Sequence, residues 1–581
     1  MLDIIFRDAI VVDGTGRPPY VASVAVRDGQ IVHIGNVPTD DAKEVIDAQG
    51  LHLTPGFIDV HTHYDGQVTW DDALLPSAAH GVTTLVMGNC GVGFSPVRPG
   101  SERWLIQLME GVEDIPGTAL YEGIQWSWES FPEYLDAIDR NYAVDIAAQI
   151  PHGALRAYVM GERGAADEAA TGEDIALMAK LVREAVEAGA VGFSSSRTAI
   201  HQARDGRYVP GTTAAIDELL AIGQAMRAGG GAVFELVPSG RGIPGVGDPW
   251  TAAEELELIR HFARETGQRV TFSTAQTSHQ PEVFDQILGY VTDNLSELPV
   301  YMQFSGRCGG VLSSLRSSHA LQRRPTFVDL AELSLAEQAA RLADPRTKAR
   351  ALSEADLPPK GAAFTDRFDE FLRKHYAQTF TLGDPPEYEP EQSTSVLAQA
   401  QAAGVHPLEV IYDRLIEDEG RAVLITITTN YATGDYQCVE QLLNLDATVL
   451  GLGDGGAHVR YICDASTPTY VLSHWTRDRT RGPKVAIETV VAKQTGVPAV
   501  LYGFTDRGTI ETGKRADLNL IDMRELRLEV PRFVNDLPAG SLRVLQDAHG
   551  YVMTMVHGVV TRRNDVDTGA RPGRLVRNSA Q

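Results

Sequence analysis

Hydrophobic and polar residues alternate in short runs at both ends of the chain. Near the N-terminus, the run over residues 3–12 leads into the turn Asp-Gly-Thr-Gly, and a second run follows over residues 22–35. Residues 507–521 and 550–562 repeat this pattern of short apolar runs around glycine turns. Such runs are typical of antiparallel strands joined by tight turns. We therefore predict one small β-sandwich domain assembled from both termini.

The middle of the chain consists of apolar runs without alternation, separated by helix-like stretches. Continuous apolar runs are typical of strands buried on both faces of a sheet. One helix is expected over residues 175–189, where apolar residues recur at helical spacing and the pattern ends at Gly189. Strands alternating with helices predict an α/β fold, a (β/α)8 barrel. The eight predicted strands cover residues 56–60, 83–88, 143–150, 190–196, 232–237, 269–275, 300–304 and 448–453.

The spacing between the last two predicted strands is unusual, because about 140 residues separate them. We interpret residues from about 308 to 420 as a large insertion over the barrel mouth. Residues 421–431 resemble a further strand, so the alternative is that the strand count is wrong by one here. The predicted domains are residues 1–54 (first part of the β-sandwich), 55–485 (barrel with its insertion) and 486–581 (a helix, the second part of the β-sandwich and a tail).

The charge and cysteine content restrict the class of protein. The formal net charge of −26 repels nucleic acid and anionic membranes, so an anionic substrate would need a local arginine. The four cysteines are scattered without paired spacing, which is typical of a reducing compartment. The N-terminus does not resemble a signal peptide, and no apolar run has the length of a membrane span. We expect a cytoplasmic protein that acts on a small molecule.

Two histidines stand at the end of the first predicted barrel strand, in the sequence TPGFIDVHTH. Side chains two residues apart on a strand point to the same side, so His61 and His63 would project together at the C-terminal face of the barrel. This placement suits two nitrogen ligands of one metal ion. The alternative, two exposed loop histidines, is disfavoured by the apolar strand that precedes them.

PGFID followed by HTH resembles the first-strand signature of the amidohydrolase superfamily. RGTIETGKRADLNLID, near the C-terminus, resembles its closing β-sandwich segment. The resemblance implies an active site at the barrel mouth, where metal-bound water attacks a carbonyl or similar centre. It also implies an aspartate after the eighth strand, as metal ligand and as general base and acid. Asp454 in LGLGDGGAH has this place, although an ordinary Asp-Gly turn is the alternative.

Cys90, in VMGNCGVGFSP after the second predicted strand, narrows the resemblance to the N-acyl-D-amino-acid deacylase branch. In that branch a cysteine in such a turn ligates zinc; a buried, inert cysteine is the alternative. Hydantoinases and dihydroorotases carry a metal-bridging lysine at the end of the fourth strand. GFSSSRT (192–198) has no lysine there, which argues against the cyclic-amide branch. IPHGALR resembles a third-strand motif of the deacylases and makes His152 a candidate for substrate contact.

Two positions depart from the deacylase pattern. The branch has a histidine ligand at the end of strand five, where this chain has VFELVPSG and offers Glu235. A carboxylate can also ligate zinc. Strand six ends in STAQTSHQ, where His279 is the candidate ligand although Gln276 lies closer to the strand. The resemblance therefore implies zinc, as one or two ions, without settling the ligand set.

Further residues after the predicted strands are candidates for the substrate pocket. A substrate carboxylate would be bound by an arginine, and arginines follow three predicted strand ends. Tyr431 could line the same pocket, and His458 lies four residues after Asp454. Structural roles are the alternative for each of them. The three arginines are Arg197, Arg307 and Arg460.

The sequence thus predicts a zinc-dependent hydrolase that cleaves the C–N bond of an N-acyl amino acid or a related small amide. A hydrolase of a cyclic amide, imide, lactam or ester on the same fold is one alternative. A barrel that has lost catalysis and acts as a binding protein is another. The resemblance also suggests a homodimer.

Overall fold

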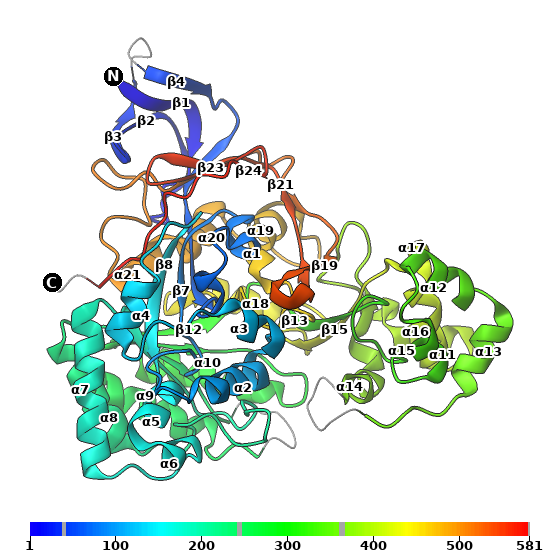
Figure 1. Ribbon diagram of the computed structural model, residues 1–581. Coiled ribbons are helices and arrows are strands. Elements are labelled where there is room, and N and C mark those ends of the chain that lie inside the picture. The colour runs from blue at the N-terminus through cyan, green and yellow to red at the C-terminus, as the bar shows by residue number, and fades with distance from the viewer. Residues whose placement is uncertain (38–41, 241–246, 360–366, 579–581) are drawn as a thin grey trace.

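The computed structural model describes residues 1–37, 42–240, 247–359 and 367–578, and its centre is a barrel of parallel strands (Figure 1). Each strand lies where the sequence predicts one. The strands are almost entirely buried, which explains their apolar runs without alternation. The predicted α/β barrel is therefore confirmed. Its strands, in spatial order, are β6 (Phe57–Thr62), β7 (Val82–Met87), β8 (Asp145–Pro151), β9 (Gly192–Ser196), β10 (Val233–Val237), β11 (Arg269–Ser273), β12 (Val300–Phe304) and β16 (Thr448–Leu450).

Helices surround the barrel. The predicted helix is α7 (Gly172–Ala188), which begins with a capping box between Thr171 and Asp174 and ends at Gly189 with a φ of 120°. No helix among the described residues combines the length and the apolar character that a membrane span requires. The other helices around the barrel include α2 (Glu102–Glu113), α3 (Gly117–Gly123), α4 (Phe131–Ala137), α5 (His152–Met160), α8 (Ile216–Ala228), α9 (Ala252–Thr266), α10 (Pro281–Asn294), α18 (Gln437–Asn444), α20 (Ile487–Gln494) and α21 (Gly496–Tyr502).

The barrel closes between its first strand and the loop after its last strand. A parallel bridge joins Thr62 to Gly455. The amide of His63 donates to the carbonyl of Gly455 at 2.7 Å, and the amide of Asp454 donates to the carbonyl of His61 at 3.1 Å. These bonds bring the two ends of the barrel sequence to one edge.

A second sheet is formed by strands from both termini and lies at one end of the barrel (Figure 1, top). Strand β17 joins the two parts, because it pairs with β5 on one side and with β22 on the other. The sequence predicts a strand, a glycine turn and a second strand over residues 507–521, but the first strand does not form. That part makes only isolated backbone hydrogen bonds, such as the one from the N–H of Ile510 to the carbonyl of Asp13 at 2.9 Å. The strands are β1 (Leu2–Val11), β2 (Tyr20–Arg27), β3 (Gln30–Gly35), β4 (Ala42–Asp47), β5 (His52–Pro55), β17 (Leu518–Ile521), β22 (Tyr551–Val556), β23 (Val559–Arg563) and β24 (Val566–Asp567).

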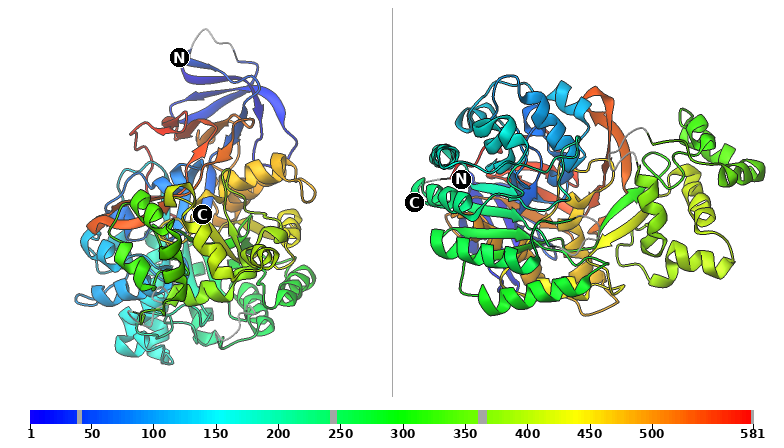
Figure 2. Two further views of the ribbon diagram at one scale, coloured as in Figure 1. Left: turned by 90° about the vertical axis from the view of Figure 1, so that its right-hand side faces the viewer. Right: turned by 90° about the horizontal axis from the view of Figure 1, so that it is seen from below.

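The insertion between β12 and β16 forms its own three-stranded sheet and helical unit. The run over residues 421–431 contains β15, which pairs with β13 and β14 and not with the barrel, so the barrel count of eight strands holds. The helices lie to the side of the barrel in Figures 1 and 2, and not over its mouth. The elements are β13 (Gly309–Ser313), α11 (Pro325–Leu330), α12 (Leu335–Leu342), α13 (Pro345–Ser353), α14 (Phe368–Lys374), β14 (Thr379–Thr381), α15 (Val396–Ala403), α16 (Pro407–Leu415), α17 (Glu417–Gly420) and β15 (Leu424–Thr429).

A buried ionic cluster connects the barrel to the C-terminal segment. Asp145, the first residue of β8, has one carboxylate oxygen 2.6 Å from both Arg507 and Arg515. Its other oxygen accepts the backbone N–H of Arg574 at 2.8 Å. Because the Asp145 side chain is only 1% exposed, removing it would leave buried cations without a partner.

We expect Asp145→Ala to lower the free energy of unfolding by about 3–5 kcal/mol, the usual effect of breaking a buried ion pair from one side. Chemical denaturation followed by circular dichroism measures this change. Asp139→Ala is the control, because Asp139 is half exposed and its pair with Arg577 spans 3.5 Å; we expect a change of at most about 1 kcal/mol. Equal changes in the two variants would contradict the structural role of Asp145.

Candidate metal centre

His61 and His63 lie at the C-terminal end of β6 and are each 1% exposed. The Nδ1 atom of His61 is 2.8 Å from the side-chain oxygen of Gln303, at the end of β12. An amide oxygen only accepts hydrogen bonds, so Nδ1 of His61 carries the hydrogen and Nε2 presents its lone pair. Hydrogen bonding of the far ring nitrogen is how metal-binding histidines are usually oriented.

Cys90 follows β7 and faces both imidazoles. Its Sγ lies 3.3 Å from Nε2 of His61 and 3.8 Å from Nε2 of His63. The residue has a φ of 57°, a left-handed conformation that is costly for any side chain other than glycine. Its backbone N–H donates to the carboxylate of Glu235 at 3.1 Å, which helps to hold this conformation. None of the four cysteines, all of which lie within the described residues, forms a disulfide.

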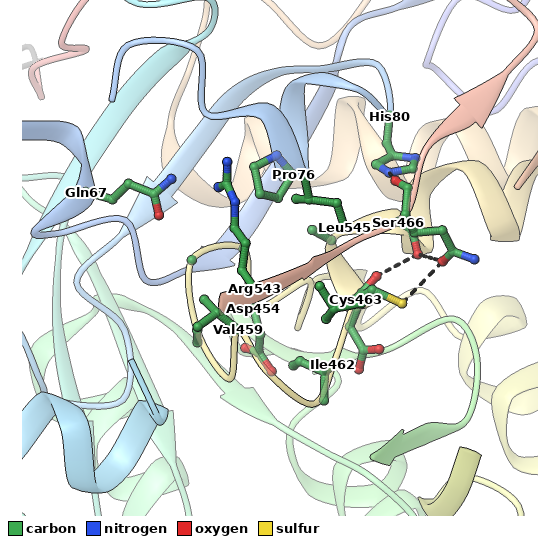
Figure 3. Close-up of a pocket in the computed structure, with 17 residues that line it drawn as sticks. Gln67, Pro76, His80, Asp454, Val459, Ile462, Cys463, Ser466, Arg543 and Leu545 are labelled. Carbon is green, nitrogen blue, oxygen red and sulfur yellow. Dashed lines mark hydrogen bonds between the residues drawn. The ribbon is translucent and has the colours of Figure 1, made fainter. Parts of the chain in front are cut away.

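Asp454 approaches the same imidazoles from the loop after β16. Its Oδ1 is 3.5 Å from Nε2 of His61 and 3.8 Å from Nε2 of His63. The φ of Asp454 is 46°, and the bonds that close the barrel hold this conformation. The back of the loop is anchored separately, because Cys463 and Ser466 both donate to the side-chain oxygen of Gln546 (Figure 3).

The donor atoms have the chemistry and spacing of a site for a divalent metal ion. The ligand atoms of His61, His63 and Cys90 all lie within 4.8 Å of one another. A tetrahedral zinc ion binds nitrogen, oxygen and sulfur at about 2.0–2.3 Å, which places neighbouring ligand atoms about 3.3–3.8 Å apart. The distances from Sγ of Cys90 and from Oδ1 of Asp454 to the Nε2 atoms of the two histidines fall in this range. The residues present therefore fit a divalent ion.

The protonation states at the site depend on burial. Burial lowers the pKa of His63 well below its usual value, so this imidazole is neutral, as a metal ligand must be. Burial raises the pKa of Glu235 to about 8. Burial, together with the charge of Asp454, raises the pKa of Glu113 well above its usual value. These carboxyl groups lack compensating charge, and a bound cation would lower their pKa values.

We refer to the candidate ligands His61, His63, Cys90 and Asp454 as the cluster. The cluster opens into a cavity of about 810 Å³, a size usual for small-molecule sites. Its walls come from α2, from the base of the insertion sheet and from the loops after the barrel strands. Six carboxylic side chains and two arginines line it, so its charge is predominantly negative. The charged residues are Glu110, Glu113, Asp114, Asp205, Asp454, Asp464, Arg204 and Arg460.

Glu235 lies beside the cluster but below the cavity floor. It is fully buried, and it approaches His61 from the Nδ1 side at 3.8 Å, not from the Nε2 side that faces Cys90. Val237 is two residues further along β10 and points to the same side, so Val237 and not Glu235 lines the cavity. The structure thus places the Glu235 side chain behind His61, on the side away from Cys90 and the cavity.

His279 is not brought to the cluster. The turn after β11 pairs with the insertion sheet through a bridge between Thr277 and Thr429, and His279 leaves the barrel beyond it. Its side chain is exposed, with its ring 6.0 Å from that of His375. The end of strand six presents Ser273 to the cavity instead.

His152 and Arg197, predicted as substrate contacts, are buried away from the cavity lining. His152 bonds through its two ring nitrogens to Ser195 at 2.9 Å and Glu218 at 2.8 Å. Arg197 donates to Glu255 at 2.8 Å. Their polar atoms therefore stabilise the barrel wall.

Arg307 and Tyr431 are also outside the cavity lining. Arg307 is 1% exposed, pairs with Asp464 at 2.8 Å and stacks 3.9 Å from the ring centre of Tyr388. The hydroxyl of Tyr431 donates to the carbonyl of Pro390 at 2.5 Å. These contacts hold the loops behind the cavity in place. The polar groups of Arg307 and Tyr431 are thus bonded to other parts of the protein and do not face the cavity.

His458 and Arg460 do line the cavity, as their positions after the last strand predict. Arg460 pairs with Asp114 at 2.6 Å, and its Nε has no hydrogen-bond partner among the described residues. Two contributors were not predicted, Gln303 behind His61 and Glu113 beside His63. Neither has a local signal, since Glu113 is one carboxylate among several on α2 and Gln303 is one polar residue in an apolar strand.

Comparison with known families agrees with this architecture, since a model of the amidohydrolase family matches residues 44–562. The chain belongs to the amidohydrolase family. It is accordingly a hydrolase of amide bonds, built on the barrel that the sequence signature predicted. The match covers most of the chain, including the insertion and the strands β5, β17 and β22 of the β-domain.

Several of the relatives are deacylases of the D-aminoacylase type. The N-acyl-D-aspartate deacylase of Alcaligenes xylosoxydans xylosoxydans is 26% identical, covering 99% of this chain and 95% of the relative. The D-aminoacylase of the same organism is 25% identical, covering 100% of this chain and 98% of the relative. The fold of the N-acyl-D-glutamate deacylase from Bordetella bronchiseptica, solved with zinc and a phosphonate inhibitor, is similar with a TM-score of 0.63 at 21% identity, covering 99% of this chain and 100% of that one. The resemblance to the D-aminoacylase branch is therefore confirmed.

If His61 and His63 bind a metal, His63→Ala should weaken zinc binding by about 100-fold or more, because even partners outside the ligand set change affinity by about 10–100-fold. Equilibrium dialysis followed by elemental analysis measures the bound zinc. His261→Ala removes an exposed histidine of α9 and should leave binding unchanged. Zinc bound as tightly by His63→Ala as by the unchanged protein would refute the site.

Proposed function

We propose that this chain is a zinc-dependent deacylase of N-acyl amino acids or closely related small amides. The observation that carries the proposal is the convergence of His61, His63 and Cys90 with Asp454 where the cluster opens into the cavity. The similarity to deacylases along the whole chain supports this substrate class.

The proposed chemistry divides between the metal and Asp454. A bound divalent ion lowers the pKa of a water molecule and polarises the amide carbonyl. Asp454 is partly exposed at the cavity, with its Oδ1 directed to both imidazoles. There it accepts the proton of the attacking water and later donates it to the leaving amine. Gln303 keeps His61 in the tautomer that binds the metal.

The cavity favours a substrate with one carboxylate. Arg460 is the candidate partner, since it lines the cavity with a side chain that is 35% exposed, and its guanidinium can hold a carboxylate beside Asp114. The excess of carboxylic side chains in the lining repels a second negative charge. Apolar walls at Val112, Val237 and Val311 suit an aliphatic acyl group or side chain. We therefore propose N-acyl derivatives of neutral amino acids as substrates.

Asp454→Asn should reduce kcat, expressed per bound zinc, by about 10²–10⁴-fold, the usual contribution of a general base. Steady-state hydrolysis of N-acetyl derivatives of neutral D- and L-amino acids, with the zinc content of each sample, measures this. Asp418→Asn, which removes an exposed carboxylate of the insertion that pairs with Arg421 and lies outside the cavity lining, is the control and should retain activity. Undiminished hydrolysis by Asp454→Asn would refute the mechanism.

Arg460→Gln should raise KM by about 10–100-fold, the loss expected for a hydrogen bond to a charged group. The effect should disappear with substrates whose carboxylate is capped as an amide. Activity measured across N-acyl neutral amino acids, N-acyl acidic amino acids and cyclic imides tests the substrate class. Hydrolysis of cyclic imides alone would reject the deacylase assignment, and metal binding without any hydrolysis would indicate a binding protein.

A further inference from the structure

Glu113 is the last residue of α2, and its side chain reaches His63 of the candidate ligand cluster. One carboxylate oxygen, Oε2, lies 3.5 Å from Nε2 of His63 and 3.5 Å from Nε2 of His458. The side chain is 2% exposed. The other oxygen, Oε1, is buried and has no hydrogen-bond partner among the residues that the structure describes.

The end of α2 is fixed in this position by two links to the loop after β16. The backbone carbonyl of Glu113 accepts the N–H of His458 at 2.5 Å. The next residue, Asp114, has a φ of 49° and pairs with Arg460 at 2.6 Å. The loop that carries Asp454 thus also holds Glu113 at the cluster, so the placement does not depend on the Glu113 side chain alone.

The carboxyl group of Glu113 is buried among other acidic groups. Its electrostatic neighbours include Asp454, Asp65 and Glu235, all of which carry the same sign of charge. Among the described residues, no lysine or arginine forms an ion pair with Glu113 or Glu235. A buried carboxylate needs a cation, a proton or several hydrogen bonds to offset the loss of hydration. The imidazoles of His63 and His458 lie 3.5 Å from Oε2, and neutral imidazoles do not supply a full positive charge.

The spacing of Glu113 is that of a metal ligand. Around Nε2 of His63, the ligand atoms of Cys90, Asp454 and Glu113 lie at 3.8, 3.8 and 3.5 Å. Such separations arise when neighbouring donors share an ion at about 2.0–2.3 Å. On the opposite wall, strands five and six present Val237, Ser273 and Ala275, with no imidazole, thiol or carboxylate among them.

We propose that Glu113 is a ligand of the metal centre and supplies, from the end of α2, the donor that the ends of strands five and six lack. Residues from the end of β6, the loop after β7, the loop after β16 and the end of α2 would then hold the ion together. The proposal rests on the proposed function only in assuming that the cluster binds a divalent ion. His458 is a positioning residue, because its backbone and side chain both contact Glu113.

The test compares Glu113→Gln with Glu110→Gln in the full-length protein, without substrate. Glu110 lies one turn earlier on α2, lines the same cavity and pairs with Arg204, so its variant removes the same charge from the same helix. Competition with a chromophoric chelator gives the dissociation constant for Zn²⁺. We expect Glu113→Gln to weaken binding by about 10-fold or more and Glu110→Gln by less than about 3-fold. Equal affinities in the two variants would overturn the proposal.

The visible absorption spectrum of the Co²⁺-loaded protein shows whether Glu113 binds the metal itself or only positions other ligands. In the Co²⁺-loaded protein, the intensity and position of the d–d bands report coordination number and geometry. We expect Glu113→Gln to change these bands and Glu110→Gln to leave them as in the unchanged protein. Weaker binding with an unchanged spectrum would mean that Glu113 acts only through its neighbours, and would also overturn the proposal.

Glu113→Asp provides a second variant if Glu113→Gln fails to fold, as judged by circular dichroism of the metal-free protein. It keeps the charge but withdraws the oxygens by one methylene group, so the Co²⁺ spectrum should shift and the affinity should fall. An unchanged spectrum and affinity would again overturn the proposal. Zinc ligation by Glu113 without amide hydrolysis would refute the proposed function alone, whereas hydrolysis with an indifferent Glu113 would refute this inference alone.

Discussion

The site depends on the closure of the barrel between β6 and the loop after β16. Two backbone hydrogen bonds, from Asp454 to His61 and from His63 to Gly455, bring together residues almost 400 positions apart in the chain. Left-handed backbone conformations at Cys90 and Asp454 would each cost about 1–3 kcal/mol, and they persist because the surrounding bonds determine them. The same contacts that complete the barrel therefore also assemble the candidate ligands.

Burial of negative charge is the second constraint, and it follows from the first. Closing the barrel places carboxyl groups and a thiol among apolar walls, where burial raises the pKa values of Glu113 and Glu235. A bound divalent cation would lower the pKa values of these groups and would be matched by the neutral imidazole that burial imposes on His63. Fold and charge are coupled in this way, since the contacts that close the barrel also bury these acidic groups close to one another.

Much of the architecture is predictable from the sequence because its signals are local. Apolar runs of strand length, the period of the helix over residues 175–189 and the glycine turns near both termini depend only on neighbouring residues. In a parallel barrel all strands end at one face, so residues at the ends of strands converge whatever the details of packing. For this reason the sequence by itself is enough to group His61, His63, Cys90 and Asp454 at one face of the barrel.

Long-range packing decided the remaining members of the site. Glu113 reaches the cluster because α2 docks on the loop after β16, and no spacing within α2 indicates that contact. Conversely, His279, Arg197 and Arg307 follow strand ends, yet each faces a partner far away in the sequence. Glu235 lies below the floor of the cavity because Val237, two residues further along β10, occupies the inward-facing position that lines the cavity. A local sequence pattern indicates where a strand ends and which side a residue faces. Which polar residues reach the cavity depends on the tertiary structure, because a buried charged side chain turns toward the partner that offsets its loss of hydration.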